Sequence, residues 1–226
     1  MNINDFDKIW CLHCVEHNNR YVISQNEFKK VNILDKIDYR WTSLQIPINI
    51  RTCLPQLKTE SEYHCTREHY TMINIAYHLG YNHVLIFEDD AKFIKKNYFD
   101  LFMNSIPDDF DILRLGGAVN HIYENGPKLF DNGIYWTKLD FKLWCTIGYA
   151  LSRKGMKYYL DYIKSRYSVA DMPLYDINAI RSAGINCYIS TLPICYYHKF
   201  DSSIQPVNDF EFKDEFYKNI DLTLYN

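Results

Sequence analysis

The chain has no excess of basic residues. Its 226 residues include 25 Lys and Arg against 28 Asp and Glu, a net charge of -3. Because binding along a nucleic-acid backbone needs a basic surface, this balance argues against a general nucleic-acid-binding protein. It leaves room for a local basic pocket that holds one nucleotide.

Long apolar runs are also missing. No segment approaches the roughly 20 apolar residues of a transmembrane helix, and the polar start from Met1 to Lys8 does not resemble a secretory signal. No internal repeat, low-complexity linker or shift in composition divides the chain. With 47% hydrophobic residues the chain has enough apolar side chains for a substantial core. We therefore expect one cytoplasmic domain over residues 1–226.

The seven cysteines do not form a disulfide framework, because their number is odd and their spacing irregular. Cys11 and Cys14 form a Cys-x-x-Cys pair, but no second pair follows to complete the four ligands of a structural zinc site. Free thiols in a reducing compartment are the simpler interpretation.

The most informative stretch runs from Tyr81 to Phe93. Its apolar part, Val84 to Phe87, has the length of a buried strand, and three carboxylates, Glu88, Asp89 and Asp90, follow directly. Alternation along an extended backbone places Glu88 and Asp90 on one face and Asp89 on the other. Hard oxygen ligands suit Mg²⁺ or Mn²⁺. The alternative is a solvated turn or a helix N-terminus, where acidic residues are also common.

The remaining pattern predicts alternating strands and helices, and so an α/β protein with one nucleotide-binding domain and a mixed, mostly parallel sheet flanked by helices. Thr59 and Glu62 have capping-box spacing at the start of a helix that ends at Leu79. Turn signals at Asn125-Gly126-Pro127 and Asn132-Gly133 predict a hairpin over 121–139. Further elements are expected as strands at 8–15, 111–115 and 144–152, and as helices at 21–34, 96–106, 153–166 and from Asp171 to before Gly184.

Several of these segments, in this order, resemble glycosyltransferase family 25, which includes lipooligosaccharide and collagen galactosyltransferases. The run from Glu62 to His69 matches the family's helix start at Glu62, Cys65 and His69, although Ser61, His64 and Glu68 replace two glycines and a serine. The run from Leu85 to Ala91 matches the strand end Leu-Glu-Asp-Asp of the family. Similar segments follow at 110–116 and 148–155, and the resemblance covers about residues 8 to 200.

This resemblance implies a GT-A fold, a divalent metal, Mn²⁺ or Mg²⁺, and a nucleotide sugar donor such as a UDP-hexose. The acceptor is expected to be a glycan or glycoconjugate hydroxyl, and the linkage is expected to form with inversion. Asp90 is expected to bind the metal directly, with Glu88 on ribose or on a metal-bound water. His198 is the expected distant metal ligand, with a surface histidine beside a strand as the alternative.

Three further side chains are candidates for donor binding or for its support. Asp89 is expected to hold Glu88 or Asp90 in place. Arg20, after the first strand, is expected to meet a phosphate or a base, with an unpartnered surface arginine as the alternative. His69 lies on the apolar face of its helix, where a core histidine and a donor-pocket residue are equally open interpretations.

An inverting transfer needs a carboxylate that accepts the proton of the acceptor hydroxyl. Asp171 and Asp176 are the candidates. Asp171 is expected to cap a helix, and hydrogen bonds from backbone N–H groups lower the pKa of a carboxylate. Asp176 is expected one turn further along the same helix, facing the cleft, and is the preferred base.

Two other functions stay open at this point. The first is a phosphohydrolase that uses Asp89 or Asp90 as the nucleophile on a similar sheet. The second is a non-catalytic binder of sugars or nucleotides, suggested by the replaced glycines and serine in the helix after Thr59.

Overall fold

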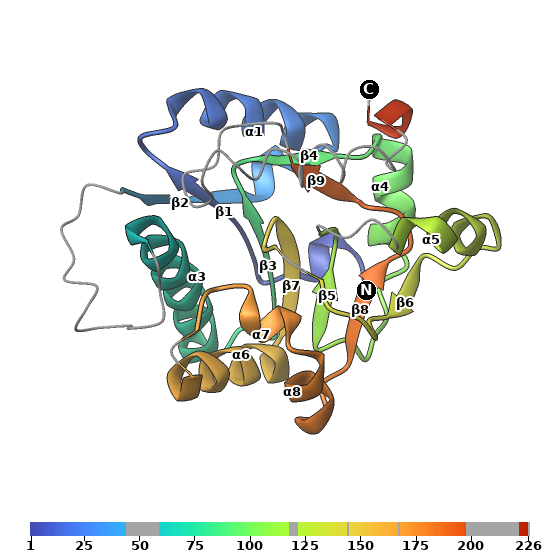
Figure 1. The fold of residues 1–226 in the computed structure, drawn as a ribbon. Coiled ribbons are helices and arrows are strands. Elements are labelled where there is room, and N and C mark those ends of the chain that lie inside the picture. Colours follow the sequence, from blue (N-terminus) through green and yellow to red (C-terminus); the bar gives the residue numbers. More distant parts are fainter. Residues whose placement is uncertain (44–58, 118–121, 144, 167, 198–221, 226) are drawn as a thin grey trace.

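The computed structural model describes residues 1–43, 59–117, 122–143, 145–166, 168–197 and 222–225. A seven-stranded sheet runs through the middle of the molecule (Figure 1). Its strands, in spatial order, are β2 (Ile37–Thr42), β1 (Lys8–Cys14), β3 (His83–Glu88), β7 (Gly148–Ser152), β5 (Ile112–Arg114), β8 (Cys187–Ser190) and β6 (Trp136–Lys138).

Five of these strands run in one direction. β1 is parallel to β2 and β3, and β5 is parallel to β8, whereas β7 is antiparallel to both β3 and β5 and β6 is antiparallel to β8. The predicted α/β class, with a mixed and mostly parallel sheet, is therefore confirmed. The parallel arrangement brings the carboxyl ends of β1, β2 and β3 to one edge, where an open α/β sheet binds its ligands.

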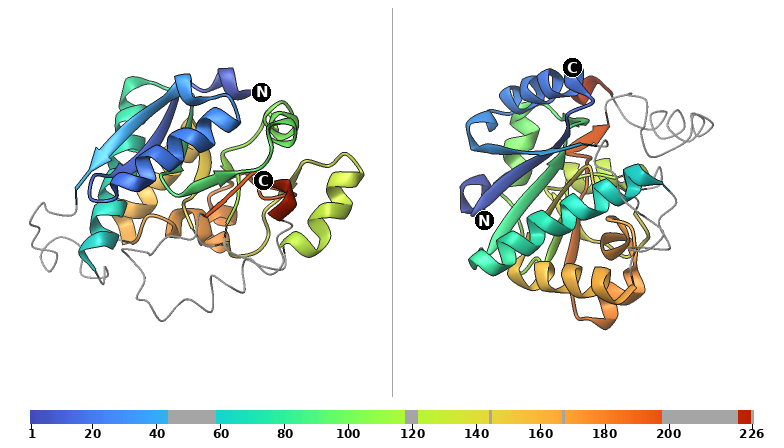
Figure 2. Two further views of the ribbon diagram at one scale, coloured as in Figure 1. Left: turned by 90° about the horizontal axis from the view of Figure 1, so that it is seen from above. Right: turned by 90° about the vertical axis from the view of Figure 1, so that its left-hand side faces the viewer.

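Helices cover both faces of the sheet (Figure 2). On one side lie α1 (Asn18–Lys30) and α4 (Lys96–Met103), and on the other lie α3 (Glu60–Leu79) and α6 (Arg153–Arg166). α6 has the bounds that the sequence predicts, and α1 and α4 agree with their predictions except at their ends. Within the described part of the chain, no helix is both long and apolar enough to cross a membrane.

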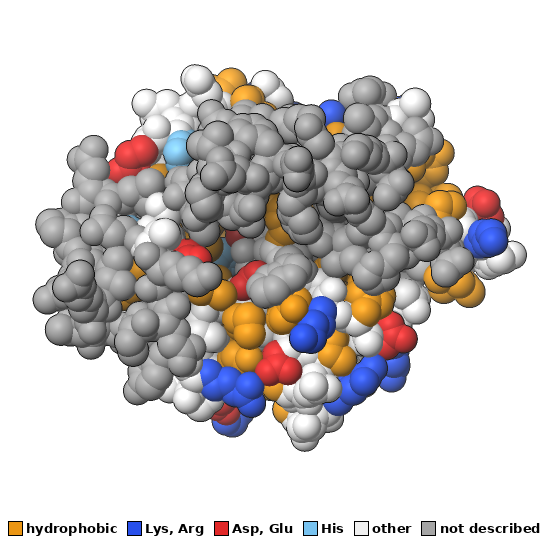
Figure 3. All heavy atoms as spheres, in the orientation of Figure 1, with side chains coloured by type: hydrophobic (Ala, Val, Ile, Leu, Met, Phe, Trp, Pro, Cys, Tyr) orange, Lys and Arg blue, Asp and Glu red, His pale blue; other side chains and the backbone are white. Residues whose placement is uncertain are grey.

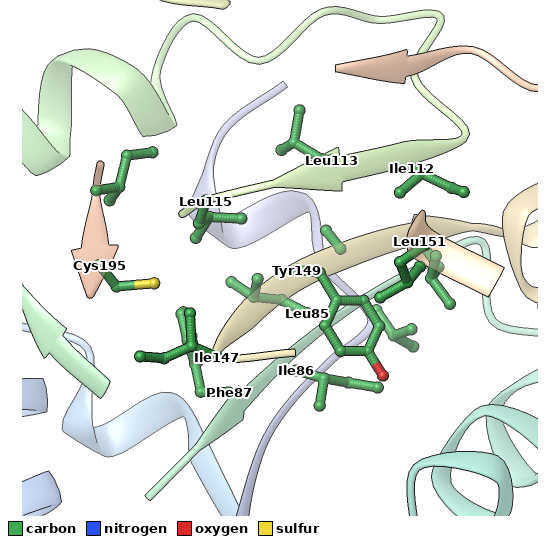
Figure 4. Packing of buried hydrophobic residues seen from close by; sticks show 14 of the residues in the cluster. Leu85, Ile86, Phe87, Ile112, Leu113, Leu115, Ile147, Tyr149, Leu151 and Cys195 are labelled. Carbon is green, nitrogen blue, oxygen red and sulfur yellow. The ribbon is translucent and has the colours of Figure 1, made fainter. Parts of the chain in front are cut away.

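The core lies between these layers (Figure 4). The four residues Val84 to Phe87 are fully buried, as expected for a strand that is covered on both faces. Figure 4 shows Leu85 and Phe87 of β3 beside Ile147 and Tyr149, which belong to the β7 side of the sheet. Burial of this apolar surface fixes the position at which β3 ends, and with it the position of the carboxylates that follow.

α3 begins and ends as the sequence predicts. The Thr59 hydroxyl accepts the backbone N–H of Glu62 at 3.1 Å, and the Glu62 carboxylate accepts the N–H of Thr59 at 3.2 Å. Gly80 ends the helix with a φ of 83°, a left-handed conformation that glycine adopts without strain. These two local signals fix the helix that leads into β3.

A second, two-stranded sheet lies beyond the acidic turn. β4 (Ala91–Phe93) pairs antiparallel with β9 (Cys195–Tyr197), and Ala91 is opposite Tyr197. The pairing brings the chain just before the predicted ligand His198 next to the acidic turn. His198 itself lies outside the described residues.

The prediction of a hairpin over 121–139 is wrong. The chain forms α5 (Ile122–Asp131), followed by β6. Gly126 lies so close to the Thr191 carbonyl that a Cβ would sit 1.9 Å from its oxygen, and Phe130 stacks on Phe102 at 5.7 Å. These long-range contacts stabilise a helix despite Pro127, and Gly133, with a φ of 75°, ends it.

Candidate active site at the carboxyl end of strand β3

The three predicted carboxylates lie where β3 leaves the sheet. Leu12 of β1 pairs with Glu88, so the residues after β1 and those after β3 meet at the same edge. Figure 3 shows this face of the molecule, on which acidic side chains are visible near the centre while lysines and arginines gather along the lower edge. The three carboxylates differ in their partners, and these partners indicate what each can do.

Asp89 is held by β1 and α1. Its Oδ2 lies 2.6 Å from Nδ1 of the buried His13 and accepts the backbone N–H of Cys14 at 3.3 Å. Its Oδ1 accepts from Arg20 at 3.4 Å. With both oxygens engaged and only 7% of its side chain exposed, Asp89 ties the acidic turn to the first strand.

Arg20 bridges two of the acids. Its Nη1 lies 3.4 Å from Asp89 Oδ1 and 4.0 Å from Asp90 Oδ2. The guanidinium thus offsets part of the repulsion among the crowded carboxylates. It lies in the first turn of α1, just after the carboxyl end of β1 and beside the acidic turn.

Glu88 is oriented by two side chains from other elements. Its Oε1 accepts a hydrogen bond from the Thr146 hydroxyl and lies 3.3 Å from His69 Nε2. His69 is fully buried, and its Nδ1 lies 2.8 Å from the Tyr149 hydroxyl. In Figure 4 the Tyr149 hydroxyl extends from β7 toward α3. His69 is thus a hydrogen-bonded core histidine that also reaches the carboxylate it helps to position.

Burial decides whether the Tyr149 hydroxyl keeps its proton. Burial, and then the nearby Glu88 charge, raise the pKa of the Tyr149 hydroxyl well above its ordinary value. Tyr149 therefore keeps its proton, so its hydroxyl can donate a hydrogen bond to His69 Nδ1.

Glu88 and Asp90 remain accessible at the turn. Their side chains are 23% and 18% exposed, against 7% for Asp89. The two accessible carboxylates are the pair that alternation along the strand predicts to share a face. Two carboxylates with hard oxygen atoms fit Mn²⁺ or Mg²⁺, which fill their other positions with water and phosphate oxygens.

Asp171 does not cap a helix through its side chain, contrary to the sequence prediction. It precedes α7 (Met172–Tyr175), and in the described structure its carboxylate makes no capping hydrogen bond to that helix. Burial raises the pKa of Asp171. The charge of Arg114 and the backbone N–H of Cys145 lower this pKa, whereas the negative charge of Glu88 raises it further. The net shift is upward, as a proton acceptor near neutral pH requires.

Asp176 is the residue that caps a helix. Its Oδ1 accepts the Ala179 N–H at 3.1 Å at the start of α8 (Ile177–Ser182), and its Oδ2 accepts from Tyr162 and Arg166. Desolvation opposes the shift, but these three partners together lower the pKa of Asp176. The predicted single helix is therefore two short helices, and the capping carboxylate is that of Asp176 rather than that of Asp171.

Arg114 is a charged side chain in the core that the sequence interpretation missed. It is fully buried on β5 and donates to the carbonyls of Leu174 at 3.1 Å, Leu143 at 3.4 Å and Cys145. These bonds connect the segment before β7 to α7, beside Asp171. An arginine between Leu113 and Leu115 in an apolar strand was the available signal.

Cys145 has an unusual backbone conformation at this junction. Its φ is 89°, in the left-handed region that residues with a Cβ rarely adopt. Its carbonyl accepts from Arg114, and its N–H is a hydrogen-bond donor to Asp171. The strained peptide thus contacts both the buried Arg114 and the partly buried Asp171. Strained backbone of this kind is common at functional sites.

A pocket of about 500 Å³ opens at the carboxyl ends of β1 and β2. Arginine, glutamate and hydroxyl side chains and one half-exposed tryptophan, Trp41, form most of its wall; its lining residues are Val15, Arg40, Trp41, Thr42, Ser43, Arg67, Glu68 and Thr71. Arg40 and Arg67 both pair with Glu68. None of the predicted site residues that the structure describes lines this pocket.

Comparison with known proteins gives a match by sequence. A model of glycosyltransferase family 25, described as an LPS biosynthesis protein, matches residues 51–174, more than half of the 226-residue chain. No curated protein matches the chain.

Solved structures of glycosyltransferases resemble the chain in three dimensions. The galactosyltransferase LgtC, in complex with donor and acceptor sugar analogues, is 8% identical, with 94% of this chain and 96% of that chain covered and a TM-score of 0.40. A glycosyltransferase involved in glycosylation of the major capsid of PBCV-1 is 8% identical, with 93% and 98% covered and a TM-score of 0.44. Glucosyl-3-phosphoglycerate synthase from Mycobacterium tuberculosis is 11% identical, with 96% and 80% covered and a TM-score of 0.41. Since these TM-scores are below 0.5, the family assignment rests on the sequence match alone.

Proposed function

The chain belongs to glycosyltransferase family 25, and we propose that it is a metal-dependent, inverting enzyme that transfers a hexose from a UDP-sugar to a hydroxyl of a glycan or protein-linked acceptor. The observation that carries this proposal is the pair of accessible carboxylates, Glu88 and Asp90, at the carboxyl end of β3. Both lie beside Asp89, whose oxygens are already engaged.

Asp90 and Glu88 are the residues of the described chain that would hold a divalent ion, and His198 is the proposed third ligand. When bound, such an ion supplies Lewis-acid stabilisation of the negative charge on the diphosphate. His69 and Thr146 hold the Glu88 carboxylate in a fixed orientation from α3 and from the segment before β7. This support from two directions reduces the reorganisation needed when the donor binds.

Arg20 is proposed to act on the donor from the β1 side. Its guanidinium already contacts Asp89 and lies 4.0 Å from Asp90, so its positive charge is fixed beside the proposed diphosphate position. A diphosphate near this group gains a charge-assisted contact. The contact between Arg20 and Asp89 sets the direction of the guanidinium before the ligand arrives.

Asp171 is the proposed general base. The acceptor hydroxyl oxygen forms the new bond to the anomeric carbon while Asp171 takes its proton. The bond from that carbon to the diphosphate oxygen breaks, and its electron pair leaves with the diphosphate. The raised pKa of Asp171, caused mainly by burial, favours this role over Asp176, whose partners lower its pKa.

Arg114 and Cys145 are proposed to position this base. Arg114 bonds to carbonyls on both segments that flank Asp171, and the Cys145 N–H fixes the carboxylate. The guanidinium also limits how far burial raises the pKa of Asp171. Asp171 is thus a partly desolvated carboxylate whose upward pKa shift is moderated by a neighbouring cation.

The test is incubation with a panel of nucleotide sugars, Mn²⁺ and candidate acceptors, with release of the nucleoside diphosphate as the readout. Release that depends on both Mn²⁺ and one donor supports transfer. Release of phosphate from simple phosphate esters, without use of any nucleotide sugar, would instead support a phosphohydrolase. Donor binding without any turnover across the panel would support a non-catalytic binding protein.

A further inference from the structure

One group of metal-ligating side chains overlaps the proposed donor site: it combines His69 and Glu88, which belong to that site, with Cys65, which has no role in the transfer described above. Among the described residues, Cys65, His69 and Glu88 bring one sulfur, one nitrogen and one oxygen atom within 4.8 Å of one another. Cys65 and His69 are four residues apart on α3, so they lie on the same face of that helix. Glu88 approaches this face from the end of β3.

The geometry of this group is close to that of a zinc site. Zinc lies about 2.0 Å from nitrogen or oxygen and about 2.3 Å from sulfur in a tetrahedron, so its ligand atoms are about 3.3 to 3.5 Å apart. His69 Nε2 and Glu88 Oε1 are already 3.3 Å apart. The Cys65 sulfur lies within 4.8 Å of the ligand atoms of the other two residues, so a modest movement of the side chains would bring all three atoms to these distances.

The surrounding contacts are of the kind that support a metal-binding histidine. In metal sites the second ring nitrogen of such a histidine donates to an oxygen acceptor, which fixes the ring. Here His69 Nδ1 lies 2.8 Å from the Tyr149 hydroxyl, which can serve as that acceptor. Thr146 supports Glu88 in the same way, by donating to its Oε1.

We propose that Cys65, His69 and Glu88 bind Zn²⁺, or another thiophilic divalent cation, at a site distinct from the Asp90 metal position. On binding, the Cys65 thiol loses its proton to solvent, and water fills the fourth position; no oxidation or reduction occurs. The sulfur and nitrogen ligands select against Mg²⁺ and Mn²⁺, which prefer oxygen, and favour Zn²⁺.

Glu88 belongs to both sites, so occupancy of one affects the other. When zinc holds Glu88, this carboxylate is withdrawn from the donor site. Micromolar zinc is therefore expected to inhibit transfer even when Mn²⁺ is present in excess. This consequence rests on the proposed function, whereas the binding of zinc does not.

Cobalt provides a direct probe of the site, because a thiolate bound to Co²⁺ gives a charge-transfer absorption band. The full-length chain titrated with Co²⁺ is expected to show this band, and added Zn²⁺ is expected to abolish it. Cys65→Ser is expected to remove the band. Cys14→Ser, which alters the Cys-x-x-Cys pair, is the matched control and is expected to keep it.

Three results would overturn the proposal: no band in the wild-type chain, a band that survives in Cys65→Ser, or a band lost in Cys14→Ser. Thermal melting of each variant without metal checks that it folds. As a second readout, Tyr149→Phe is expected to weaken zinc binding about 10- to 100-fold in a chelator competition; unchanged affinity would contradict the supporting role of Tyr149.

Activity then separates this proposal from the proposed function. Wild-type transfer is expected to fall in zinc, and the transfer activity of Cys65→Ser is expected to resist the same concentration. Equal inhibition of both chains would refute the shared use of Glu88. If no nucleotide sugar is turned over by either chain, the proposed function fails, while the cobalt spectra still decide whether the zinc site exists.

Discussion

Replacing Asp171 with Asn removes one negative charge and keeps the size and shape of the side chain. An amide cannot accept the acceptor proton, so kcat is expected to fall about 10²- to 10⁴-fold, the usual contribution of a general base. This range corresponds to about 3 to 5 kcal/mol of transition-state stabilisation. The amide oxygen can still accept the Cys145 N–H, so the fold around the site is expected to remain.

Asp176→Asn is the matched control, because it makes the same chemical change five residues away. Asn caps helices about as well as Asp, and the ion pair that is lost joins Asp176 to Arg166, whose side chain is 55% exposed. Exposed pairs contribute about 0 to 1 kcal/mol. Transfer by Asp176→Asn is therefore expected to stay within a few-fold of wild type.

The assay is the initial rate of nucleoside diphosphate release at saturating donor and acceptor, with donor affinity measured separately by thermal shift. Donor affinity is expected to change little in Asp171→Asn, since the base contacts the acceptor. The pH profile gives a second check. Burial raises the pKa of Asp171 above its ordinary 3.8, so the wild-type rate is expected to fall as the pH drops through this raised value.

The opposite pattern would refute the assignment. If Asp176→Asn abolished transfer and Asp171→Asn did not, the base would be Asp176, as the sequence alone suggested. If Asp171→Asn lost donor binding together with turnover, Asp171 would serve the donor site or the fold.

Three further changes test other parts of the structure. Arg114→Met leaves three carbonyls without their buried donor and is expected to lower the free energy of unfolding, measured with urea, by about 3 kcal/mol or more. A decrease below about 1 kcal/mol would mean that these hydrogen bonds contribute little to stability. Thr59→Ala breaks the capping box of α3 and is expected to cost about 1 kcal/mol, or about 2 to 4 °C in Tm; Tm equal to wild type would contradict this. The partners of Asp176 lower its pKa in the folded state, so the ionised Asp176 stabilises the fold at pH values above its pKa in the unfolded chain. This stabilisation is expected to disappear as the pH falls through the pKa of Asp176 in the folded state. An Asp176→Ala variant with the same acid-denaturation curve as wild type would be evidence against this contribution.

Local signals in the sequence were enough to predict the elements that carry the site. Thr59, Glu62 and Gly80 define both ends of α3 through contacts within a few residues, and the run from Val84 to Phe87 is apolar because β3 is covered on both faces. The carboxylates that follow were recognisable for the same reason, since their position depends only on where the strand ends.

Contacts between distant residues decided what the sequence could not predict. α5 is stabilised by the approach of Gly126 to Thr191 and of Phe130 to Phe102, which no local pattern reveals. Of the residues that suggested turns, Gly126 and Pro127 therefore lie within α5, and Gly133 lies just after the end of that helix.

The two candidate bases illustrate the same limit. The helix cap is Asp176 rather than Asp171 because the backbone of Asp176, with a ψ of 84°, is not helical. Asp176 therefore ends α7 and precedes α8, so its side chain can cap the second helix. Similarly, the buried contacts of Arg114 and the pairing of His13 with Asp89 join residues 29 or more positions apart. Sequence spacing contains no information about such pairs.

The most direct test of the central claim is the thermal shift produced by a UDP-hexose with and without Mn²⁺, measured for the wild-type chain and for Asp90→Ala. A ligand that binds only the folded state raises Tm by mass action. The wild-type chain is expected to gain stability only when nucleotide sugar and Mn²⁺ are both present, and Asp90→Ala is expected to lose this gain. An equal shift in both chains, or one that is independent of Mn²⁺, would contradict a metal-assisted donor site at the end of β3.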